Sequence, residues 1–425
     1  MSSHYLYELW CATAKRFATE TAIFACGGER AWTFHELFTE AERETAPAKV
    51  IFPEGNGPQF LLSLLRAWRN GSVACPFDAG QSVPVLANLP GACAHVKTTS
   101  ASSGGPKSIL FTAEQLAADA ANIVSTMGLR PEWPNLACIS LAHSYGFSNL
   151  VLPLLLHGIP LIFARTPLPE MMVRAASRAL AITIPAVPAL WKAWHEAKAI
   201  PSNTRLAISA GAPLPLPLET AVFESCGLKI HNFYGSSECG GIAYDRAATP
   251  RLNAALAGSA LDNVRLTLSA NETLVVKSSA VGECYWPVSE NSGGPLTTGR
   301  FETTDLAEIR DGNVYLRGRL TDVLNIAGRK ASPENIEAAL RLHPAVIDCV
   351  VFGIPDSTRD RTEVVVAAIH TRSAIPVSDL AQFLSQKIPA WQIPRHWWFT
   401  EEIQPNSRGK ISRAEWKRRF LESKL

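Results

Sequence analysis

Short apolar runs alternate with helix-patterned segments over the first half of this chain. Residues 49–52 and 108–112 have the length and composition of strands, while residues 59–70 and 113–127 show helical periodicity. Further strands are expected at 136–141, 159–164, 206–209 and 229–233, and further helices at 148–157 and 169–180. Strands that alternate with helices in this way predict an α/β fold in which helices cover a sheet.

The pattern changes near Leu252, where the apolar runs become shorter and turn residues become more frequent. The segment Asp311-Gly312-Asn313 is typical of a hairpin turn. We therefore expect a small β-rich subdomain that ends at Tyr315-Leu316. With 425 residues, of which 47% are hydrophobic and 18% charged, the chain is long enough for two or three domains with sizeable cores.

Charge and cysteine content argue against several classes of protein. A net charge of +2 gives no electrostatic case for nucleic-acid binding. The nine cysteines are scattered without a Cys-x-x-Cys pair, so the sequence indicates neither a zinc site nor a disulfide framework. A reducing, cytoplasmic compartment is therefore expected.

No secretory signal or membrane anchor is expected. Residues 1–16 include Glu8 and Lys15 and lack an uninterrupted apolar core. The longest apolar region, residues 149–164, is interrupted by Pro153 and Pro160 and is too short to cross a bilayer. It fits a buried helix followed by a buried strand.

One loop carries an unusual density of small and hydroxylated residues, Thr98-Thr99-Ser100-Ala101-Ser102-Ser103-Gly104-Gly105-Pro106-Lys107. Such a loop can turn its backbone N–H groups onto an anion, while Ser and Thr add hydroxyl donors and Lys adds a charge. The spacing differs from that of a P-loop, so the lysine is not expected to lead into a helix. Taken alone, the segment fits either a phosphate-binding loop or a plain surface turn.

Three further segments follow downstream in a fixed order. They are Tyr-Gly-Ser-Ser-Glu at 234–238, Thr-Thr-Asp-Leu at 303–306 leading to Gly-Arg at 318–319, and Pro-Asn-Ser-Arg-Gly-Lys at 405–410. Together with the loop at 99–107 they resemble the motifs of the adenylate-forming superfamily, which includes acyl- and aryl-CoA synthetases, adenylation domains of peptide synthetases and luciferases. The resemblance covers nearly the whole chain. The chain departs from the family pattern at Ala101, Ser103, Ser237, Thr304 and Thr321. Thr304 stands where the family has a glycine.

This resemblance implies an ATP-dependent acid–thiol ligase. The carboxylic acid would be activated to an acyl adenylate with release of pyrophosphate, and then transferred to the phosphopantetheine thiol of CoA or of an acyl carrier protein. Such an enzyme must neutralise several phosphate charges and orient an in-line displacement. The implied cofactors are ATP and Mg²⁺, and the implied partners are a small carboxylic acid and CoA or an acyl carrier protein.

The resemblance also implies roles for single residues. Lys410 would bridge the carboxylate and the α-phosphate, Ser237 would contact the α-phosphate, and Glu238 would help to hold Mg²⁺. Asp305 and Arg319 would bind the ribose hydroxyls. The remaining nucleotide-binding residues are expected to be Thr99, Ser100, Ser102, Ser103, Gly104, Lys107, Gly211, Ala212, Pro213, Asn232, Tyr234 and Gly235.

The implied architecture has two domains. An N-terminal adenylation domain over 1–318 would bind ATP and the acid, and a smaller, mobile α+β C-terminal domain over 319–425 would carry Lys410. In the family, the C-terminal domain rotates between half-reactions about a hinge that falls here on Thr321 or Asp322. Gly328 matches the glycine that lines the family's thiol tunnel. The basic excess of this domain fits a solvated surface or the docking of a phosphate-rich cofactor or acidic carrier protein.

By the same resemblance, the acid pocket lies near His143, Tyr145, Phe147, Ser209 and Gly240. His143 gates this pocket or simply ends a strand as a hydrogen-bonded residue, and both interpretations remain open. The aromatic side chains of Tyr145, Phe147 and Phe233 offer flat walls that suit an aromatic ring, although aromatic residues are often plain core.

The expected substrate is a small aromatic acid such as a hydroxybenzoate, in a biosynthetic role. A short- or medium-chain fatty acid is one alternative. A catalytically silent module that binds nucleotide and a partner is another.

Overall fold

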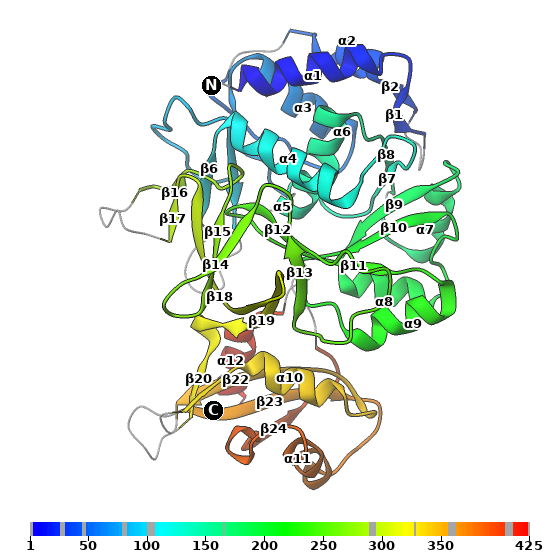
Figure 1. Ribbon diagram of the computed structural model, residues 1–425. Helices are drawn as coiled ribbons and strands as arrows, with labels where there is room; N and C mark the ends of the chain where they lie inside the picture. The colour runs from blue at the N-terminus through cyan, green and yellow to red at the C-terminus, as the bar shows by residue number, and fades with distance from the viewer. Residues whose placement is uncertain are drawn as a thin grey trace.

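The computed structural model describes residues 3–25, 30–44, 48–78, 83–99, 107–164, 166–288, 295–326, 329–355, 363–403 and 411–423. Figure 1 shows a large upper part, formed by the chain as far as β19 (Asn313–Arg319), and a smaller lower part formed by the remainder. Sheets and covering helices occur in both parts. The expected α/β class, with a large N-terminal region and a smaller C-terminal one, is confirmed.

A mixed sheet forms the centre of the large part. Its parallel half has the order β1-β8-β7-β9-β10-β11, with β2 antiparallel to β1. These strands are β1 (Thr21–Phe24), β2 (Trp32–Thr33), β7 (Asn135–Ala137), β8 (Leu161–Phe163), β9 (Ile182–Ala186), β10 (Thr204–Ser209) and β11 (Ile230–Ser236). Every residue of β8 and β9 is buried, as expected for a sheet that helices cover on both faces.

The two faces of this parallel half pack against separate hydrophobic cores. In β10, Leu206 and Ile208 belong to the core shared with α1, α3, α4 and α6, whereas Ala207 belongs to the core shared with α7, α8 and α9. The helices are α1 (His4–Arg16), α2 (Phe34–Ala41), α3 (Pro58–Arg69), α4 (Ala113–Met127), α5 (Ser144–Gly146), the π-helical η1 (Phe147–Val151), α6 (Leu152–His157), α7 (Pro169–Ala176), α8 (Pro188–Glu196) and α9 (Leu216–Cys226).

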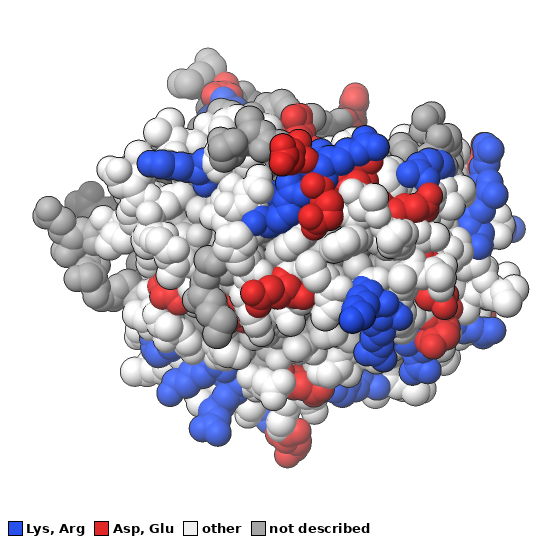
Figure 2. Space-filling view, turned by 90° about the horizontal axis from the view of Figure 1, so that it is seen from above, with Lys and Arg blue, Asp and Glu red and all other residues white. Residues whose placement is uncertain are grey.

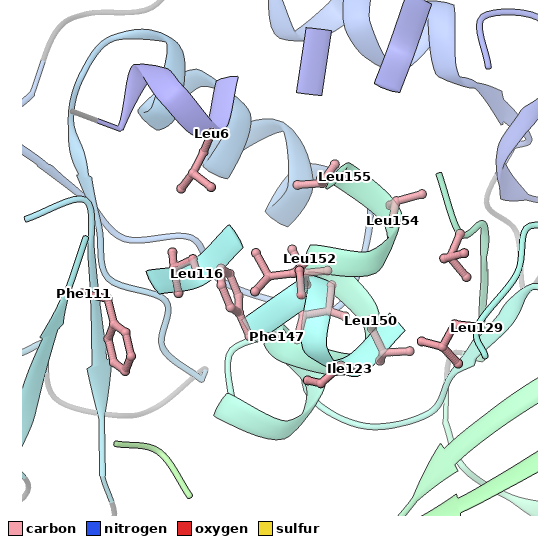
Figure 3. Packing of buried hydrophobic residues seen from close by; sticks show 14 of the residues in the cluster. Leu6, Phe111, Leu116, Ile123, Leu129, Phe147, Leu150, Leu152, Leu154 and Leu155 are labelled. Carbon is pink, nitrogen blue, oxygen red and sulfur yellow. The ribbon is translucent and has the colours of Figure 1, made fainter. Parts of the chain in front are cut away.

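Helix α4 lies at the centre of the first core. Leu116 and Ile123 of α4 pack among the apolar side chains of the following segment, including Phe147 of η1 and Leu152 of α6 (Figure 3). The bounds of α4 are set locally, because Thr112 and Gln115 form a capping box at its start and Gly128 adopts a left-handed conformation at its end.

A second sheet beside α4 has the order β16-β6-β5-β4-β3. Its strands are β3 (Val50–Ile51), β4 (Val73–Ala74), β5 (His95–Thr98), β6 (Ser108–Phe111) and β16 (Cys284–Trp286). Strand β16 comes from much later in the chain and pairs antiparallel with β6, with Tyr285 opposite Ile109. This pairing connects the loop at 99–107 to a segment that sequence motifs do not identify.

The antiparallel half of the central sheet confirms the expected β-rich region. Beyond β11 the order is β12-β13-β19-β18-β15-β14. Strands β18 and β19 form the predicted hairpin at residues 310–313, with Arg310 opposite Asn313. The strands are β12 (Gly240–Tyr244), β13 (Leu256–Ala260), β14 (Arg265–Leu268), β15 (Thr273–Lys277), β17 (Leu296–Thr297) and β18 (Arg300–Arg310).

The smaller part begins after β19 with the short 3-10 helix η2 (Leu320–Asp322). A sheet of order β22-β23-β24 and a β20-β21 ribbon form its strands, and α10 and α12 both pack on β22. The elements are β20 (Leu324–Ile326), β21 (Arg329–Ala331), α10 (Pro333–Arg341), β22 (Val346–Pro355), β23 (Glu363–Thr371), α11 (Val377–Ser385), η3 (Ala390–Gln392), β24 (His396–Phe399) and α12 (Arg413–Glu422).

The structure differs from the expected pattern at Tyr234. The sequence predicts a strand that ends at Phe233 and a loop from Tyr234, but β11 continues to Ser236 because β12 pairs with it in antiparallel fashion, placing Tyr234 opposite Ala243. Thr304 lies within the long strand β18. A threonine fits this extended position in place of the family's glycine, because β-branched residues favour strands.

Opposite charges lie next to each other on the face above α2 and α3 (Figure 2). Glu40, for example, pairs with both Arg43 and Arg66.

Among the described residues, no helix is long and apolar enough to cross a membrane.

Candidate active site

The expected phosphate-binding segment is the connection between two antiparallel strands. Strand β5 ends at Thr98 and β6 begins opposite it at Ser108. The Thr99 N–H donates to the Lys107 carbonyl at 2.8 Å, and the Lys107 N–H donates to the Thr99 hydroxyl at 3.3 Å. Lys107 therefore leads into a strand, as the non-P-loop spacing predicts. Ser100, Ser102, Ser103 and Gly104 lie outside the described residues, and their contacts with phosphate stay predictions.

Lys107 and Glu238 both contact the side chain of Tyr285, Lys107 at the ring and Glu238 at the hydroxyl. The Lys107 Nζ lies 4.9 Å from the centre of the Tyr285 ring, and the Tyr285 hydroxyl donates to Glu238 Oε1 at 3.0 Å. Burial, followed by the nearby Glu238 charge, raises the pKa of Tyr285, so the hydroxyl remains a donor. Tyr285 reaches this position through the β16–β6 pairing. No sequence motif marks Tyr285, so its place beside Glu238 was not predicted.

Glu238 sits in a tight turn between β11 and β12. The Ser236 hydroxyl accepts from the Glu238 N–H at 3.2 Å, and the Glu238 carbonyl accepts from the Gly282 N–H at 2.8 Å. The two strands approach each other too closely for a side chain at Gly235, since a Cβ there would lie 2.7 Å from the Gly240 carbonyl oxygen. Ser237, which is half-buried, lies in the same turn.

The Asp305 carboxylate accepts hydrogen bonds from two side chains, those of Tyr234 and Arg319. Tyr234 donates its hydroxyl to Asp305 Oδ2, and Arg319 Nε donates to Asp305 Oδ1 at 3.0 Å. The pairing of β18 with β19 places Asp305 directly opposite Arg319. Burial, followed by the Asp305 charge, raises the pKa of Tyr234. The structure therefore brings together three residues that the sequence analysis expected in nucleotide binding.

The other expected nucleotide-binding residues lie where β10 and β11 run side by side. Asn232 is opposite Ser209 in register and donates from Nδ2 to the Leu256 and Ala257 carbonyls at 3.4 and 3.3 Å. Gly211 follows the carboxyl end of β10 and has a φ of 86°, a conformation that favours glycine. Ala212 and Pro213 continue this turn. Carboxyl ends of parallel strands are the usual ligand-binding edge of α/β sheets.

Of the expected acid-pocket aromatics, Tyr145 packs near Phe233, with ring centres 6.0 Å apart. Phe147 is instead fully buried and packs against His95, with ring centres 4.3 Å apart. Ser209 lies on the face of β10 shared with Ala207, which is turned away from the core that contains Tyr145 and Phe233. The structure thus brings Tyr145 and Phe233 together, and Phe147 belongs to the same core. The place of these residues and of Ser209 in an acid pocket stays a prediction.

His143 has a partner from the N-terminal region. Its Nε2 lies 2.9 Å from Asp78 Oδ2, and the other oxygen of Asp78 accepts from the Ser140 hydroxyl at 2.5 Å. His143 is therefore a bonded residue at the start of α5, and its role as a gate stays a prediction. Gly240, at the start of β12, has a φ of 68° and lies against Asp119.

Within the C-terminal part, Arg413 joins the expected hinge to two helices. It pairs with Asp322 at 2.8 Å, with Glu334 at 2.7 Å and with Glu337 at 3.0 Å. Burial of Arg413 acts to lower its pKa, but the surrounding carboxylates outweigh it and the pKa is raised. Lys410 and Gly328 lie outside the described residues, so their roles stay predictions.

Comparison with known proteins decides the family. The model of the AMP-binding enzyme family matches residues 66–286, which is more than half of the chain, and that of the AMP-binding enzyme C-terminal domain matches residues 335–410. The chain belongs to the AMP-binding enzyme family. The resemblance to adenylate-forming enzymes is thereby confirmed.

Named relatives of this AMP-binding enzyme include two CoA ligases. Feruloyl-CoA synthase from an Amycolatopsis species is 26% identical over 340 residues, which cover 76% of this chain and 69% of the relative. A probable 2-succinylbenzoate–CoA ligase from Mycobacterium tuberculosis is 28% identical over 401 residues, which cover 87% of this chain and 97% of the relative. The ATP-bound structure of MatB from Rhodopseudomonas palustris superposes with a TM-score of 0.86 at 18% identity and full coverage of both chains, which shows the shared fold.

The described residues of this AMP-binding enzyme fit a magnesium nucleotide. They contain no group of three or more His, Cys, Asp or Glu side chains that would hold a metal by themselves. Mg²⁺ does not need one, because it usually binds one or two carboxylates and completes its shell with phosphate oxygens and water. Glu238, half-buried and held by Tyr285 beside Lys107, has the chemistry of that single carboxylate ligand.

Proposed function

We propose that this AMP-binding enzyme activates a small aromatic carboxylic acid with ATP and transfers the acyl group to the thiol of CoA. The observation that carries the proposal is the Lys107–Tyr285–Glu238 contact. It places a cation and a carboxylate beside the point where the two ends of the 99–107 loop are hydrogen-bonded to each other. A magnesium nucleotide needs both kinds of group, one for phosphate and one for the metal.

In the first half-reaction, a carboxylate oxygen of the acid attacks the α-phosphorus and pyrophosphate leaves. Lys107 and the hydroxyls of residues 99–104 hold the departing phosphates, and Ser237 contacts the α-phosphate. Asp305 and Arg319 orient the ribose, and Lys410 bridges the attacking carboxylate and the α-phosphate. Bound Mg²⁺ supplies further neutralisation of phosphate charge. These groups act mainly by position and charge, which is the usual basis of catalysis in phosphoryl chemistry.

The second half-reaction uses the C-terminal domain. Residues 1–318 form the adenylation domain and residues 319–425 the mobile domain, which rotates to remove Lys410 and to bring Gly328 to the thiol tunnel. The thiol attacks the acyl carbon and AMP leaves. CoA is the favoured acceptor because the names of both relatives specify CoA products. A phosphopantetheinylated carrier protein remains the alternative acceptor, and the cytoplasm is the proposed location.

The aromatic acid is supported by two observations. The rings of Tyr145 and Phe233 have their centres 6.0 Å apart, with a tilt of 40° between them, near the carboxyl ends of the parallel strands. Flat apolar side chains of this kind favour stacking or edge contacts with an aromatic substrate. Feruloyl-CoA synthase and 2-succinylbenzoate–CoA ligase, the named relatives, both act on acids that contain an aromatic ring.

The test is ATP–pyrophosphate exchange across a panel of hydroxybenzoates, hydroxycinnamates, succinylbenzoate and aliphatic acids of increasing length. Each active acid is then offered CoA or a phosphopantetheinylated carrier protein. We expect exchange with an aromatic acid and thioester formation with CoA. A preference for fatty acids would change the acid class, and preference for the carrier protein would change the acceptor. Tight ATP binding without exchange for any acid would contradict the proposed enzyme and favour a nucleotide-binding module.

A further inference from the structure

Helix α4 carries an unexpected row of buried polar side chains. Gln115, Asp119 and Asn122 are each at most 5% exposed, and their spacing places them on one side of the helix. Burying such groups costs free energy unless each finds a partner. Their partners come from segments near the site, since Gln115 donates to Glu283 at 2.5 Å and Asn122 donates to Ser278 at 3.4 Å.

Asp119 is the centre of this row. Its Oδ1 accepts from the Gly241 N–H at 3.1 Å, and its Oδ2 accepts from the Ser148 hydroxyl at 2.6 Å. Lys97 Nζ lies 3.8 Å from the same Oδ2 and donates to Ser148 at 3.4 Å. The Asp119 carboxylate also presses against the backbone at Gly240, where a Cβ would lie 2.0 Å from Oδ1.

This cluster joins the segments that carry the candidate site. Lys97 lies on β5, two residues before Thr99, and Gly241 lies three residues after Glu238. Ser148 lies three residues after Tyr145. The Asp119 carboxylate thus contacts β5, which leads into the expected phosphate-binding loop, β12, which follows the Glu238 turn, and η1, which follows Tyr145.

Core stability alone does not account for such a buried pair. The side chains of Lys97 and Asp119 are only 3% and 2% exposed, and burial lowers the pKa of Lys97 even though Asp119 acts to raise it. Well-packed apolar residues often replace a buried ion pair without loss of stability. This carboxylate also accepts hydrogen bonds from the Gly241 backbone and from the Ser148 side chain, and such a network fixes the relative positions of the segments it joins.

We propose that Asp119 is a positioning residue for the binding of magnesium nucleotide. It holds the Gly240–Gly241 backbone, and through it the Glu238 turn, at a fixed place relative to β5, while Lys97 orients the carboxylate through the ion pair. The proposal rests on the proposed role of Glu238 as the magnesium ligand. It predicts an effect on MgATP that exceeds any effect on metal-free ATP.

The test is calorimetric binding of ATP with and without Mg²⁺ to the full-length Asp119→Asn variant. Asparagine keeps the shape, but with a single oxygen it cannot reproduce both the Gly241 and the Ser148 hydrogen bonds, and it removes the ion pair of Lys97. We expect the Kd for MgATP to rise about tenfold and that for metal-free ATP to change by less than about threefold. In a Glu238→Gln background, the same substitution should have little further effect, because the two residues act through one contact.

Asn203→Ala serves as the matched control. Asn203 donates two hydrogen bonds to the Ala176 and Ala179 carbonyls, at the end of β10 away from the site. This variant should lower the Tm and leave both ATP affinities unchanged. If Asp119→Asn lowers the Tm but leaves the Kd for MgATP unchanged, or if its effect persists in the Glu238→Gln background, the proposal is wrong.

A double variant decides the matter if Asp119→Asn does not fold. Lys97→Met with Asp119→Leu removes both buried charges together and leaves the Gly241 N–H without its acceptor. The proposal expects the same loss of MgATP affinity, and an unchanged affinity overturns it. All these measurements are of nucleotide binding, so their outcome does not depend on whether any acid supports pyrophosphate exchange.

Discussion

The Tyr285 hydroxyl donates a hydrogen bond to the Glu238 carboxylate at 3.0 Å, although the two residues are 47 positions apart in the chain. The ring of the same tyrosine contacts Lys107, whose ammonium group lies over it. A single side chain therefore spaces the expected phosphate-binding lysine from the expected magnesium ligand.

Replacing Tyr285 by phenylalanine should lower the rate of ATP–pyrophosphate exchange about tenfold to a hundredfold, because a hydrogen bond to a charged group contributes about 1.5–3 kcal/mol. The ring under Lys107 is retained, so the KM for ATP should rise less than in Tyr285→Leu, which removes the ring as well. Steady-state exchange kinetics at several Mg²⁺ concentrations measure both. An exchange rate equal to that of the unmodified enzyme would show that the hydroxyl does not orient Glu238.

Lys410→Ala should abolish adenylate formation and leave thioester formation from a supplied acyl adenylate largely intact. The reason is that the lysine bridges the reacting groups only in the first step. Exchange kinetics follow the first half-reaction, and chromatographic detection of the acyl-CoA follows the second. Lys417→Ala, which changes a lysine on α12, is the control and should leave both steps active. An equal loss of both half-reactions would mean that Lys410 has a different role.

Gly146→Ala should lower the free energy of unfolding by about 3 kcal/mol or more, because overpacking against backbone has no flexible atom to yield. A Cβ at this position would lie 1.9 Å from the Ser140 carbonyl oxygen. Gly57→Ala is the control, since a Cβ there meets nothing within 4 Å and its φ of −164° is ordinary extended backbone. Urea unfolding of both variants measures the difference. Equal stabilities would contradict the close packing of α5 on residue 140.

Buried thiols should make the fold less stable at alkaline pH. Burial raises the pKa of Cys75 and of Cys138 to about 12, against an ordinary value of 9.0. The unfolded chain therefore loses these protons first. Their contribution to stability is complete below pH 9 and declines as the pH rises from about 9 towards about 12, by up to about 1.4 kcal/mol per pH unit for each thiol.

The measurement for this pH dependence is urea unfolding at a series of pH values from neutral to alkaline. The variant with Cys75→Ala and Cys138→Ala is less stable at neutral pH because of the cavities it creates, but its stability should decline less steeply above pH 9. Parallel pH dependences for the two proteins would show that other groups cause the decline.

Local signals allowed much of the fold to be predicted. The expected helix at 113–127 has the bounds of α4, because its capping residues Thr112 and Gly128 are sequence neighbours of the helix itself. The hairpin at 310–313 is confirmed for the same reason. The ordered motifs also identified the family. Five expected site residues occupy the two clusters that the structure assembles, namely Tyr234, Asp305, Arg319, Lys107 and Glu238.

The remainder depended on contacts between distant segments. Which face of β10 carries Ser209 depends on how the strands pair and on which helices cover each side. The residues around Ser209 in the sequence do not show this. Tyr285 enters the site only because β16 pairs with β6, and Asp119 meets Gly241 across 122 positions of the chain.

The sequence by itself determined the order of helices and strands, the family and the chemical types of the site residues, because these reside in local patterns. Tertiary structure alone decided which side chains meet around Glu238. The physical reason is that a buried carboxylate or tyrosine hydroxyl must find its partner wherever packing places one, irrespective of sequence distance.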